Sequence, residues 1–553
     1  MKKWVIKRSY SERADVLSGL LHNRGIEPAE REQFLNPPSI SYYLKHLPPT
    51  FKASLKKAQE EITQAIKQNT PIIIHGDYDA DGICATAILY KTLTETLGYK
   101  KVLYFIPNRF DQGYGLSLDS VKEIDKLALD NYRGQGGLII TVDCGITAET
   151  QVIKSAHDLG FKLIIADHHQ KKESDPQVPV VLWNDSMVGA GIALVLSIIL
   201  GLKDEQLLSL AGIATVTDLA PLKGFNRALV KKSLIILNTN PPPGIKSLLA
   251  VSGRAGGEVS VYDLGYIIGP RLNAAGRLDS AHDSLKLLLE KCEDETAKIA
   301  QKLNAVNMER QEMTQRMFEL AGKLVVSSSD KVILAASPEF HEGVIGLVAG
   351  KLAQKYYKPA IVISVNGDTA KGSARSVAGV NIIELLRHFE SRFIGLGGHP
   401  MAAGFSLKKE NLEQFTADFI KFTQETVSPD LLIPVLNIDL ELPLSVVDAD
   451  LLKEVDQLKP YGIANPEPLF LSRDVGVAGS DFVGRDGAHL SLKLFDGQST
   501  YKAILFDAKN LGFLGFDLGT KLDIVYAAAI KEFNGRVSLD LVIKDWDSGE
   551  RLN

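Results

Sequence analysis

Short apolar runs alternate with stretches of helical period between residues 51 and 183. The apolar runs are residues 71–76 (PIIIHG), 101–107 (KVLYFIP), 137–143 (GLIITVD) and 162–167 (KLIIAD). Helical stretches at 85–97 and 148–159 lie between them. Continuous apolar strands joined by helices are typical of a parallel sheet that is covered on both faces. The pattern therefore predicts an α/β domain whose ligands bind beyond the carboxyl ends of the strands.

The rest of the chain shows three further patterns. Residues 184–283 are mainly of helical period, and their most apolar window, 188–202, is too short for a membrane span and predicts a buried helix. A polar helical stretch follows, then a second α/β pattern, then short alternating strands typical of a small barrel such as an OB-fold. The predicted parts are an N-terminal segment (1–50) packing on the first domain, a first α/β domain (51–283), a connector helix (284–325), a second α/β domain (326–430) and an all-β barrel (431–553).

Composition changes this picture little. The chain is 45% hydrophobic and 23% charged, which is ordinary for a globular protein. The first residues lack the pattern of a secretory signal, and the three cysteines include no CxxC pair, so we expect a cytoplasmic protein without a membrane anchor. The net charge of −5 does not exclude nucleic acid, because a whole-chain sum hides local fields.

Acidic and imidazole side chains gather where the predicted strands end. Four clusters share this position: His75, Asp77, Asp79 and Asp81 in HGDYDADG; Asp143 in TVDCG; Asp167, His168 and His169 in ADHH; and Asp218 in TVTDLAP. Strand ends of one parallel sheet meet at one edge, so these side chains should converge. Several carboxylates in one site repel one another, and a pair of divalent cations, Mn²⁺ or Mg²⁺, resolves that conflict. Two such cations are suited to phosphoryl transfer.

Each cluster taken alone has a plainer explanation. A single Asp at a strand end is more often a helix cap or a turn residue. Asp81 precedes Gly82 and an apolar helix, so capping or orienting a ligand suits it as well as direct coordination does. The DHH triplet alone would most often be a solvated loop. Clusters at four equivalent positions favour a catalytic metal site.

The four motifs, in this order, resemble the metal motifs of the DHH phosphoesterase superfamily. GSARS (372–376) and GLGGHPMAAGF (395–405) resemble its accessory DHHA1 domain. PRLNAAGRL (270–278), FHEGVIGLVAGKL (340–352) and PYGIANPEPLF (460–470) are similar to the RecJ family of single-strand exonucleases. The resemblance implies two α/β domains joined by a long connector helix, followed by an OB-like barrel.

The resemblance also implies roles for individual residues. It gives as metal ligands His75, Asp77, Asp79, Asp143, His168 and Asp218. Asp143 would bridge the cations, and Asp167 and His169 would orient His168. His399 would hydrogen-bond the scissile phosphate, and Arg277 would stabilise the transition state. Asp81 stands with these catalytic candidates, its role left open.

Further residues would bind the DNA strand. Ser373 and Arg375 resemble a pocket for a 5′-phosphate, and Gly397 and Gly398 would let the backbone approach the ligand closely. The expected contacts to the strand come from Arg109, Arg271, Asn273 and, by base stacking, Tyr114. Tyr114 could equally be a core residue. On the sequence, PRLNAAGRL is interpreted as a loop, and PYGIANPEPLF could serve packing alone.

The predicted function is a metal-dependent 5′-to-3′ exonuclease that hydrolyses single-stranded DNA to 5′-mononucleotides in repair and recombination. The resemblance adds a single-strand-binding protein and a RecQ-type helicase as partners of a monomeric enzyme. Two alternatives stay open: a small-substrate phosphodiesterase for oligoribonucleotides or cyclic dinucleotides, and a non-catalytic replication scaffold that binds single strands.

Overall fold

The structure is a computed structural model whose elements divide into two units. The described residues are 2–10, 15–108, 115–132, 136–171, 176–278, 280–325, 330–484, 486–509, 513, 515–533 and 536–548. One unit, the barrel unit, comprises Met1–Ile40, Pro221–Ala228 and Val435–Asn553; the other, the α/β unit, comprises Ser41–Ala220 and Leu229–Pro434.

The first sheet of the α/β unit is parallel, as the apolar runs predict. Its five strands run in the order β3-β2-β4-β5-β6. They are β2 (Ile72–His75), β3 (Val102–Phe105), β4 (Gly137–Val142), β5 (Phe161–Asp167) and β6 (Val180–Trp183). The first four confirm the predicted strands, and β6 extends the sheet beyond them.

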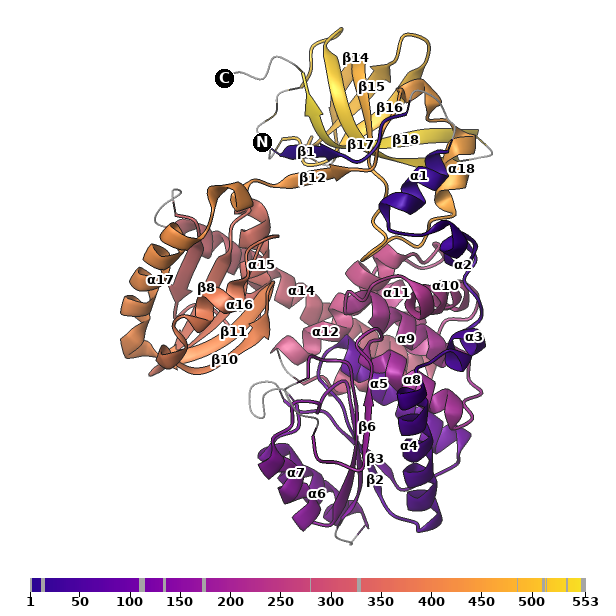
Figure 1. The fold of residues 1–553 in the computed structure, drawn as a ribbon, viewed down its shortest axis with the longest axis vertical. Coiled ribbons are helices and arrows are strands. Elements are labelled where there is room, and N and C mark those ends of the chain that lie inside the picture. The colour runs from indigo at the N-terminus through magenta and orange to yellow at the C-terminus, as the bar shows by residue number, and fades with distance from the viewer. Residues whose placement is uncertain are drawn as a thin grey trace. The chain divides into compact units, whose positions relative to one another are not determined.

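Helices cover both faces of this sheet, which explains the continuous apolar strands. In Figure 1, α6 (Leu118–Tyr132) and α7 (Thr150–Asp158) lie on one face, and α4 (Pro49–Lys67), α5 (Ala80–Lys91) and α8 (Gly189–Ile199) on the other. Helix α8 confirms the buried helix predicted from the most apolar window. Among the described residues, no helix combines the length and the apolar composition needed to cross a bilayer.

The stretch PRLNAAGRL is helical, so its interpretation as a loop is wrong. Helix α9 (Gln206–Thr217) comes earlier, and the π-helix η3 (Asp263–Ile268) leads directly into α12 (Gly269–Leu278). Pro270 is the second residue of α12, and two alanines, which favour a helix, follow it at positions 274 and 275. The side chains of residues 270–278 therefore project from a helix and not from an irregular loop.

The predicted connector consists of two helices. Helix α13 (His282–Leu289) ends at Glu290, whose backbone is extended, and α14 (Glu293–Leu324) begins after Cys292. The Glu290 carboxylate accepts hydrogen bonds from the backbone N–H groups of Lys291 and Cys292. Acidic residues in the first turn of α14 favour a helix start because they face the positive end of its dipole.

The second sheet is mixed and contains strands that the sequence pattern did not reveal. Its order is β10-β11-β9-β8-β7, and only β7 and β8 are parallel. The strands are β7 (Ile333–Ser337), β8 (Ala360–Asn366), β9 (Thr369–Arg375), β10 (Phe393–His399) and β11 (Ala402–Lys408). Successive residues of β8 face opposite sides of the sheet and belong to different cores. Ile361 packs with the aromatic residues of α17 (Leu412–Thr426), and Val362 packs with α15 (Ile345–Tyr356).

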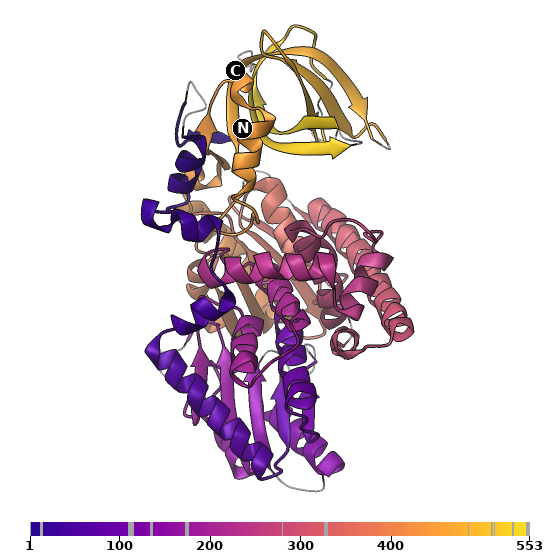
Figure 2. The same cartoon turned by 90° about the vertical axis from the view of Figure 1, so that its right-hand side faces the viewer.

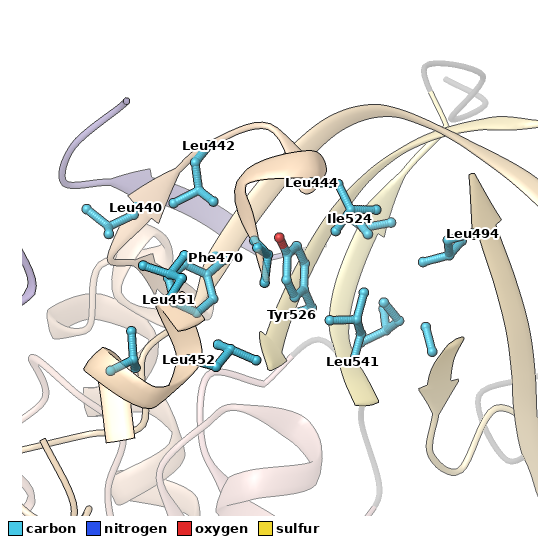
Figure 3. Close-up of a cluster of buried hydrophobic side chains, with 14 of the residues drawn as sticks. Leu440, Leu442, Leu444, Leu451, Leu452, Phe470, Leu494, Ile524, Tyr526 and Leu541 are labelled. Carbon is cyan, nitrogen blue, oxygen red and sulfur yellow. The ribbon is translucent and has the colours of Figure 1, made fainter. Parts of the chain in front are cut away.

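The last strands form a closed barrel, in agreement with the predicted OB-like fold. The order is β13-β14-β15-β16-β18-β17, and an additional pairing of β14 with β17 closes it (Figure 2). The strands are β13 (Leu440–Glu441), β14 (Phe470–Val483), β15 (His489–Phe495), β16 (Thr500–Leu505), β17 (Lys521–Phe533) and β18 (Arg536–Asp547). Tyr526 is buried in the core of leucine, isoleucine and phenylalanine side chains shown in Figure 3.

The N-terminal segment belongs to this barrel unit, whereas the sequence led us to expect it on the first α/β domain. Strand β1 (Lys3–Ile6) pairs in parallel with β12 (Val435–Ile438), and Leu20 of α1 (Val16–Asn23) joins the barrel core. A pairing between residues more than 400 positions apart leaves no local signal, because β1 looks like any short exposed strand.

The motif PYGIANPEPLF is used for packing, one of the two roles that its composition left open. Asn465 is fully buried; its amide N–H groups donate to the carbonyls of Leu458 and Pro460, and its side-chain oxygen accepts from Arg24. Arg227 is also fully buried. Its guanidinium donates to the backbone carbonyls of Phe34, Gln457, Lys459 and Pro460.

We expect replacement of Arg227 by Ala to destabilise the barrel unit by about 3 kcal/mol or more, because buried carbonyls would lose their donors. The measurement is urea unfolding followed by fluorescence in a Trp183→Phe background, where the remaining tryptophans, Trp4 and Trp546, both belong to this unit. Lys453→Ala removes an exposed ion pair and is the control. A loss no larger than that of the control would contradict the assigned role.

Candidate metal centre

The first acidic cluster forms a tight turn between β2 and α5. Asp79 is the N-cap of α5, and its carboxylate accepts hydrogen bonds from the backbone N–H groups of Asp81 (2.9 Å) and Gly82 (3.2 Å). A side chain at position 82 would lie 2.5 Å from the backbone nitrogen of Asp77. Glycine is therefore required there, and the turn holds Asp77 and Asp79 close together.

Asp143 lies at the centre of the site. It follows β4 in a left-handed backbone conformation (φ 62°) and is 1% exposed. A Cβ at Gly189, the first residue of α8, would lie 2.5 Å from the Cβ of Asp143, so only glycine fits there. Burial raises the pKa of Asp143 well above its usual range, and the charges of Asp81, Asp79, Asp77 and Asp218 raise it further.

His168, which follows β5, completes the convergence that the strand ends predict, whereas Asp218 reaches the same site from the carboxyl end of helix α9, so its predicted place at a strand end is wrong. The Nε2 atom of His168 lies 3.1 Å from a carboxylate oxygen of Asp143 and 3.6 Å from one of Asp218. Burial and the neighbouring carboxylates raise the pKa of Asp218 to about 8. Three overlapping groups have ligand atoms within 4.8 Å of one another: Asp77, Asp79 and Asp143; Asp81, His168 and Asp218; and Asp143, His168 and His169.

Asp167 orients the imidazoles that follow it. One of its oxygens accepts from the backbone N–H groups of His168 and His169 and from Nδ1 of His169, and the other accepts from the N–H of Ile146. Burial favours a higher pKa for Asp167, but the hydrogen bonds from His169 and Ile146 outweigh it and the pKa is lowered. Burial works against a charge on His169, yet Asp167 raises its pKa to about 9.

Asp81, whose role the sequence left open, caps a helix. Its two carboxylate oxygens accept from the backbone N–H groups of Gly189 and Ala190 at 2.7 Å each, at the start of α8. It also lies 3.6 Å from Nε2 of His168. Burial and the charge of Asp79 raise the pKa of Asp81 to about 7. Capping is therefore what the structure shows for this carboxylate.

His75 is close to the carboxylates in sequence but belongs to none of the three groups found among the described residues. It is fully buried, burial lowers its pKa to about 4, and its Nε2 has no hydrogen-bond partner within the described part of the chain. Its Nδ1 lies 3.4 Å from the thiol of Cys144, a contact that the sequence analysis missed. The thiol of Cys144 also donates to the backbone oxygen of His75 at 3.8 Å. With Nδ1–H donating to the sulfur, Nε2 keeps a lone pair for a cation.

Helix α12 supports the acidic turn. The side-chain oxygen of Asn273 accepts from the N–H of Ala80 at 2.7 Å, and a Cβ at Gly276 would lie 2.6 Å from the carbonyl of Tyr78. Asn273 therefore holds the acidic turn between β2 and α5 in place. The sequence predicted a contact of Asn273 with the DNA strand, and it did not predict this support of the turn. Arg271 donates to the side chain of Asn304 and to the carbonyl of Ile267.

The second domain brings Ser373, Arg375 and His399 together. Ala402 of β11 pairs with both Arg375 of β9 and His399 of β10. Arg375 donates to the hydroxyl of Ser373 at 3.2 Å, and burial and the charge of Arg375 lower the pKa of His399. A Cβ at Gly346, in the first turn of α15, would lie 3.0 Å from Arg375 and 3.1 Å from Ser373. The two side chains thus lie at a helix N-terminus, where anions bind readily.

The two glycines predicted to let the backbone approach the ligand differ in whether their surroundings require glycine. Gly398 has φ 148°, and a Cβ there would clash with the backbone of Ala402 and Ala403, whereas Gly397 has open space around it. Only Gly398 is therefore required by its backbone. Arg109 and Tyr114 lie outside the described residues.

Known proteins resemble the chain along nearly its whole length. Family models match residues 71–217 (DHH family, N-terminal domain), 329–425 (DHHA1 domain) and 438–545 (RecJ OB domain). A protein of Bacillus subtilis named single-stranded-DNA-specific exonuclease RecJ is 31% identical over 98% of this chain and 70% of its own length.

Two crystal structures of RecJ from Thermus thermophilus share the fold. The one in complex with Mn²⁺ has a TM-score of 0.81 and 28% identity, and the match covers 100% of this chain and 80% of that one. The one in complex with Mg²⁺ has a TM-score of 0.73 and 26% identity, over 98% of this chain and 78% of that one.

The raised pKa values of Asp218 and His169 predict that the metal-free protein loses stability between about pH 7 and pH 9, after the contribution of Asp81 has been lost at lower pH. The raised pKa values of Asp81 (about 7), Asp218 (about 8) and His169 (about 9) mean that the folded state binds protons more tightly than the unfolded chain, and that contribution is lost as the pH rises through them. His75 and His168, whose pKa values are lowered to about 4, are neutral in both states over this range.

The measurement is the melting temperature of chelator-treated protein across this range. Added Mn²⁺ should raise it more at pH 9 than at pH 7, because cations then replace protons. The variant Asp218→Asn should flatten the dependence. A melting temperature that stays constant from pH 7 to pH 9 would contradict this account of the site.

Proposed function

The chain belongs to the RecJ family of single-stranded-DNA-specific exonucleases, and on this premise we propose that it degrades single-stranded DNA from the 5′ end with Mn²⁺ or Mg²⁺ as cofactor. The observation that carries the proposal is the convergence on Asp143, after β4, of the clusters that follow β2 and β5 and of Asp218 at the end of α9, with Nε2 of His168 3.1 Å from Asp143. Neither a small-substrate phosphodiesterase nor a non-catalytic scaffold is favoured by a specific observation, and the similarity to RecJ along 98% of the chain supports the exonuclease.

The donor set fits divalent cations. Asp77, Asp79, Asp143, His168 and Asp218 would hold two of them, and the lone pair of the buried Nε2 of His75 is available as a further ligand. Bound cations would supply Lewis-acid activation of water and neutralisation of charge during phosphodiester hydrolysis. Asp167 would keep the imidazoles oriented through its hydrogen bonds, and Asp81 would keep α8 in place.

The second domain would set the direction of cleavage. Ser373, Arg375 and the N-terminus of α15 offer a hydroxyl, a guanidinium fork and backbone N–H groups, which suit a terminal phosphate. A 5′-phosphate held there would place the first phosphodiester at the cations. His399, beside Arg375, would donate to the scissile phosphate, and Arg277 would stabilise charge in the transition state.

The barrel would bind the strand farther along. Exposed Phe482 and Phe506 lie on its surface, and the ring of Phe506 is 5.1 Å from that of His489. Unpaired bases stack on such rings whatever their sequence. We also propose release of 5′-mononucleotides in repair and recombination in the cytoplasm, by a monomer that works beside a helicase and a single-strand-binding protein. Family membership supports these points; light scattering tests the mass, and co-purification tests the partners.

Replacement of Asp143 by Ala should reduce Mn²⁺-dependent degradation of single-stranded DNA by about 10³-fold or more, because the cations lose their central ligand. The measurement is release of nucleotides from a labelled oligonucleotide. Asp158→Ala, at an exposed position of the same domain, is the matched control. Undiminished activity of the Asp143 variant would refute the metal assignment.

Replacement of Arg375 by Ala should raise KM for a 5′-phosphorylated strand by about 10- to 100-fold, since a charge-assisted contact is lost. KM for a 5′-hydroxyl strand should change little. For the 5′-phosphorylated strand, Arg375→Lys should give a KM between those of the wild type and the Ala variant. Oligonucleotides labelled at one end or the other follow the polarity, and the 5′ label should leave first. Early release of the 3′ label would overturn the direction.

A further inference from the structure

A stripe of less buried residues runs along η3 and α12. Its members follow one another at intervals of four, four, three and four residues, which keeps them on one face of a helix. They are Tyr262, Tyr266, Pro270, Asn273 and Arg277. Residues on the other side of the same helices are buried, among them Leu264, Ile268, Leu272 and Ala275. The stripe is therefore the open face of a helical stretch that is otherwise packed.

Two stacked tyrosines stand at the beginning of this stripe. The ring centroids of Tyr262 and Tyr266 are 4.9 Å apart and their planes differ by 22°. The residues are 62% and 68% exposed, the largest exposures among the aromatic residues of the described chain. Core packing does not explain them. A flat, exposed aromatic surface of this kind suits a planar partner such as an unpaired base.

The stripe leads from these tyrosines to the metal centre. A Cβ at Gly265 would lie 3.5 Å from Val216, and one at Gly269 would overlap Thr217, the residue before Asp218. Asn273, seven residues after Tyr266, holds the acidic turn through Ala80. Seven residues span about 10 Å along a helix, which equals about three stacked nucleotides at roughly 3.4 Å each.

Uncompensated positive charge accompanies the stripe. Arg271 follows Pro270 on the same helix, and the hydrogen bonds that it donates go to neutral groups, the side chain of Asn304 and the carbonyl of Ile267. Burial and the charge of Arg271 lower the pKa of Arg310, so the two guanidiniums lie within electrostatic range. Within the described residues, neither forms an ion pair. Phosphates of a nucleic acid strand would supply the missing negative charge.

We propose that Tyr262 and Tyr266 form a base-stacking platform that holds the single strand on the 3′ side of the cleaved nucleotide, with Arg271 and Arg310 attracting its backbone. The proposal rests on the proposed exonuclease function and adds a binding site at a stated place along the strand. It predicts a dependence on strand length, because a dinucleotide is too short to reach from the cations to the tyrosines.

The first test measures affinity by fluorescence anisotropy in the cleavage-deficient Asp143→Ala background, with a 20-nucleotide strand and a dinucleotide. Tyr262→Ala combined with Tyr266→Ala should weaken binding of the long strand by about 10- to 100-fold and leave that of the dinucleotide unchanged. The corresponding double Phe variant should bind normally, since it keeps the rings. Tyr42→Ala, which removes another exposed tyrosine, is the control.

The second test needs no variant of the tyrosines. Strands carrying a single 5-iodouracil at successive positions are irradiated on the Asp143→Ala protein, and cross-linked peptides are identified by mass spectrometry. Cross-links to Tyr262 or Tyr266 should appear about three nucleotides from the 5′ end and be absent at the terminal nucleotide. Cross-links that avoid both tyrosines at every position would overturn the platform.

Other results separate the platform from the exonuclease itself. Normal degradation of DNA by the wild type, with unchanged affinity of the double Ala variant, would overturn the platform alone. A wild type that neither degrades nor binds single strands would overturn both proposals. A double Ala variant whose mass in light scattering is lower than that of the wild type would assign the tyrosines to a contact between two copies, which also overturns the platform.

Discussion

Electrostatic repulsion among carboxylates in a small buried volume is the constraint on which the rest of the site depends. Asp77, Asp81 and Asp143 are each at most 3% exposed, and their neighbours Asp79 and Asp218 add further negative charge. The raised pKa values of Asp81, Asp143 and Asp218 express that conflict in the absence of cations. Positive charge must enter for all of these groups to ionise, so a cation site is the direct consequence of the packing.

The fold supports this crowding with backbone N–H groups and with glycines. The N-termini of α5 and α8 satisfy Asp79 and Asp81, and a backbone N–H satisfies one oxygen of Asp167. Gly82, Gly189 and Gly276 allow the acidic turn, α8 and α12 to approach more closely than any side chain would permit. Helix α12 is the common support, since the same helical stretch holds the acidic turn through Asn273 and carries the tyrosine pair at its beginning.

Much of the fold and of the site could be predicted from local pattern. The four apolar runs became β2 to β5, and the clusters after β2, β4 and β5 met as expected, because the ends of parallel strands share one edge; Asp218 instead follows helix α9. Other elements gave no usable signal. The strands β9 and β10 contain glycines that hide the alternation of a sheet, and the break at Glu290 depends on a side-chain cap within a polar helical pattern. The contact of Cys144 with His75 had no signal either, because TVDCG shows Cys144 directly after Asp143 but not the side chain that it meets.

The sequence by itself determined most of the side chains that gather at the candidate metal centre, since carboxylates and imidazoles at the ends of parallel strands meet at one edge of the sheet, and only Asp218 arrives from a helix end. Tertiary structure alone decided which contacts their side chains make. It placed both oxygens of Asp81 on the N-terminus of α8, turned Asn273 toward the acidic turn, and put the N-terminal segment into the barrel unit. These outcomes depend on contacts between residues far apart in the chain, and hydrogen-bond partners at such separations leave no periodicity to read.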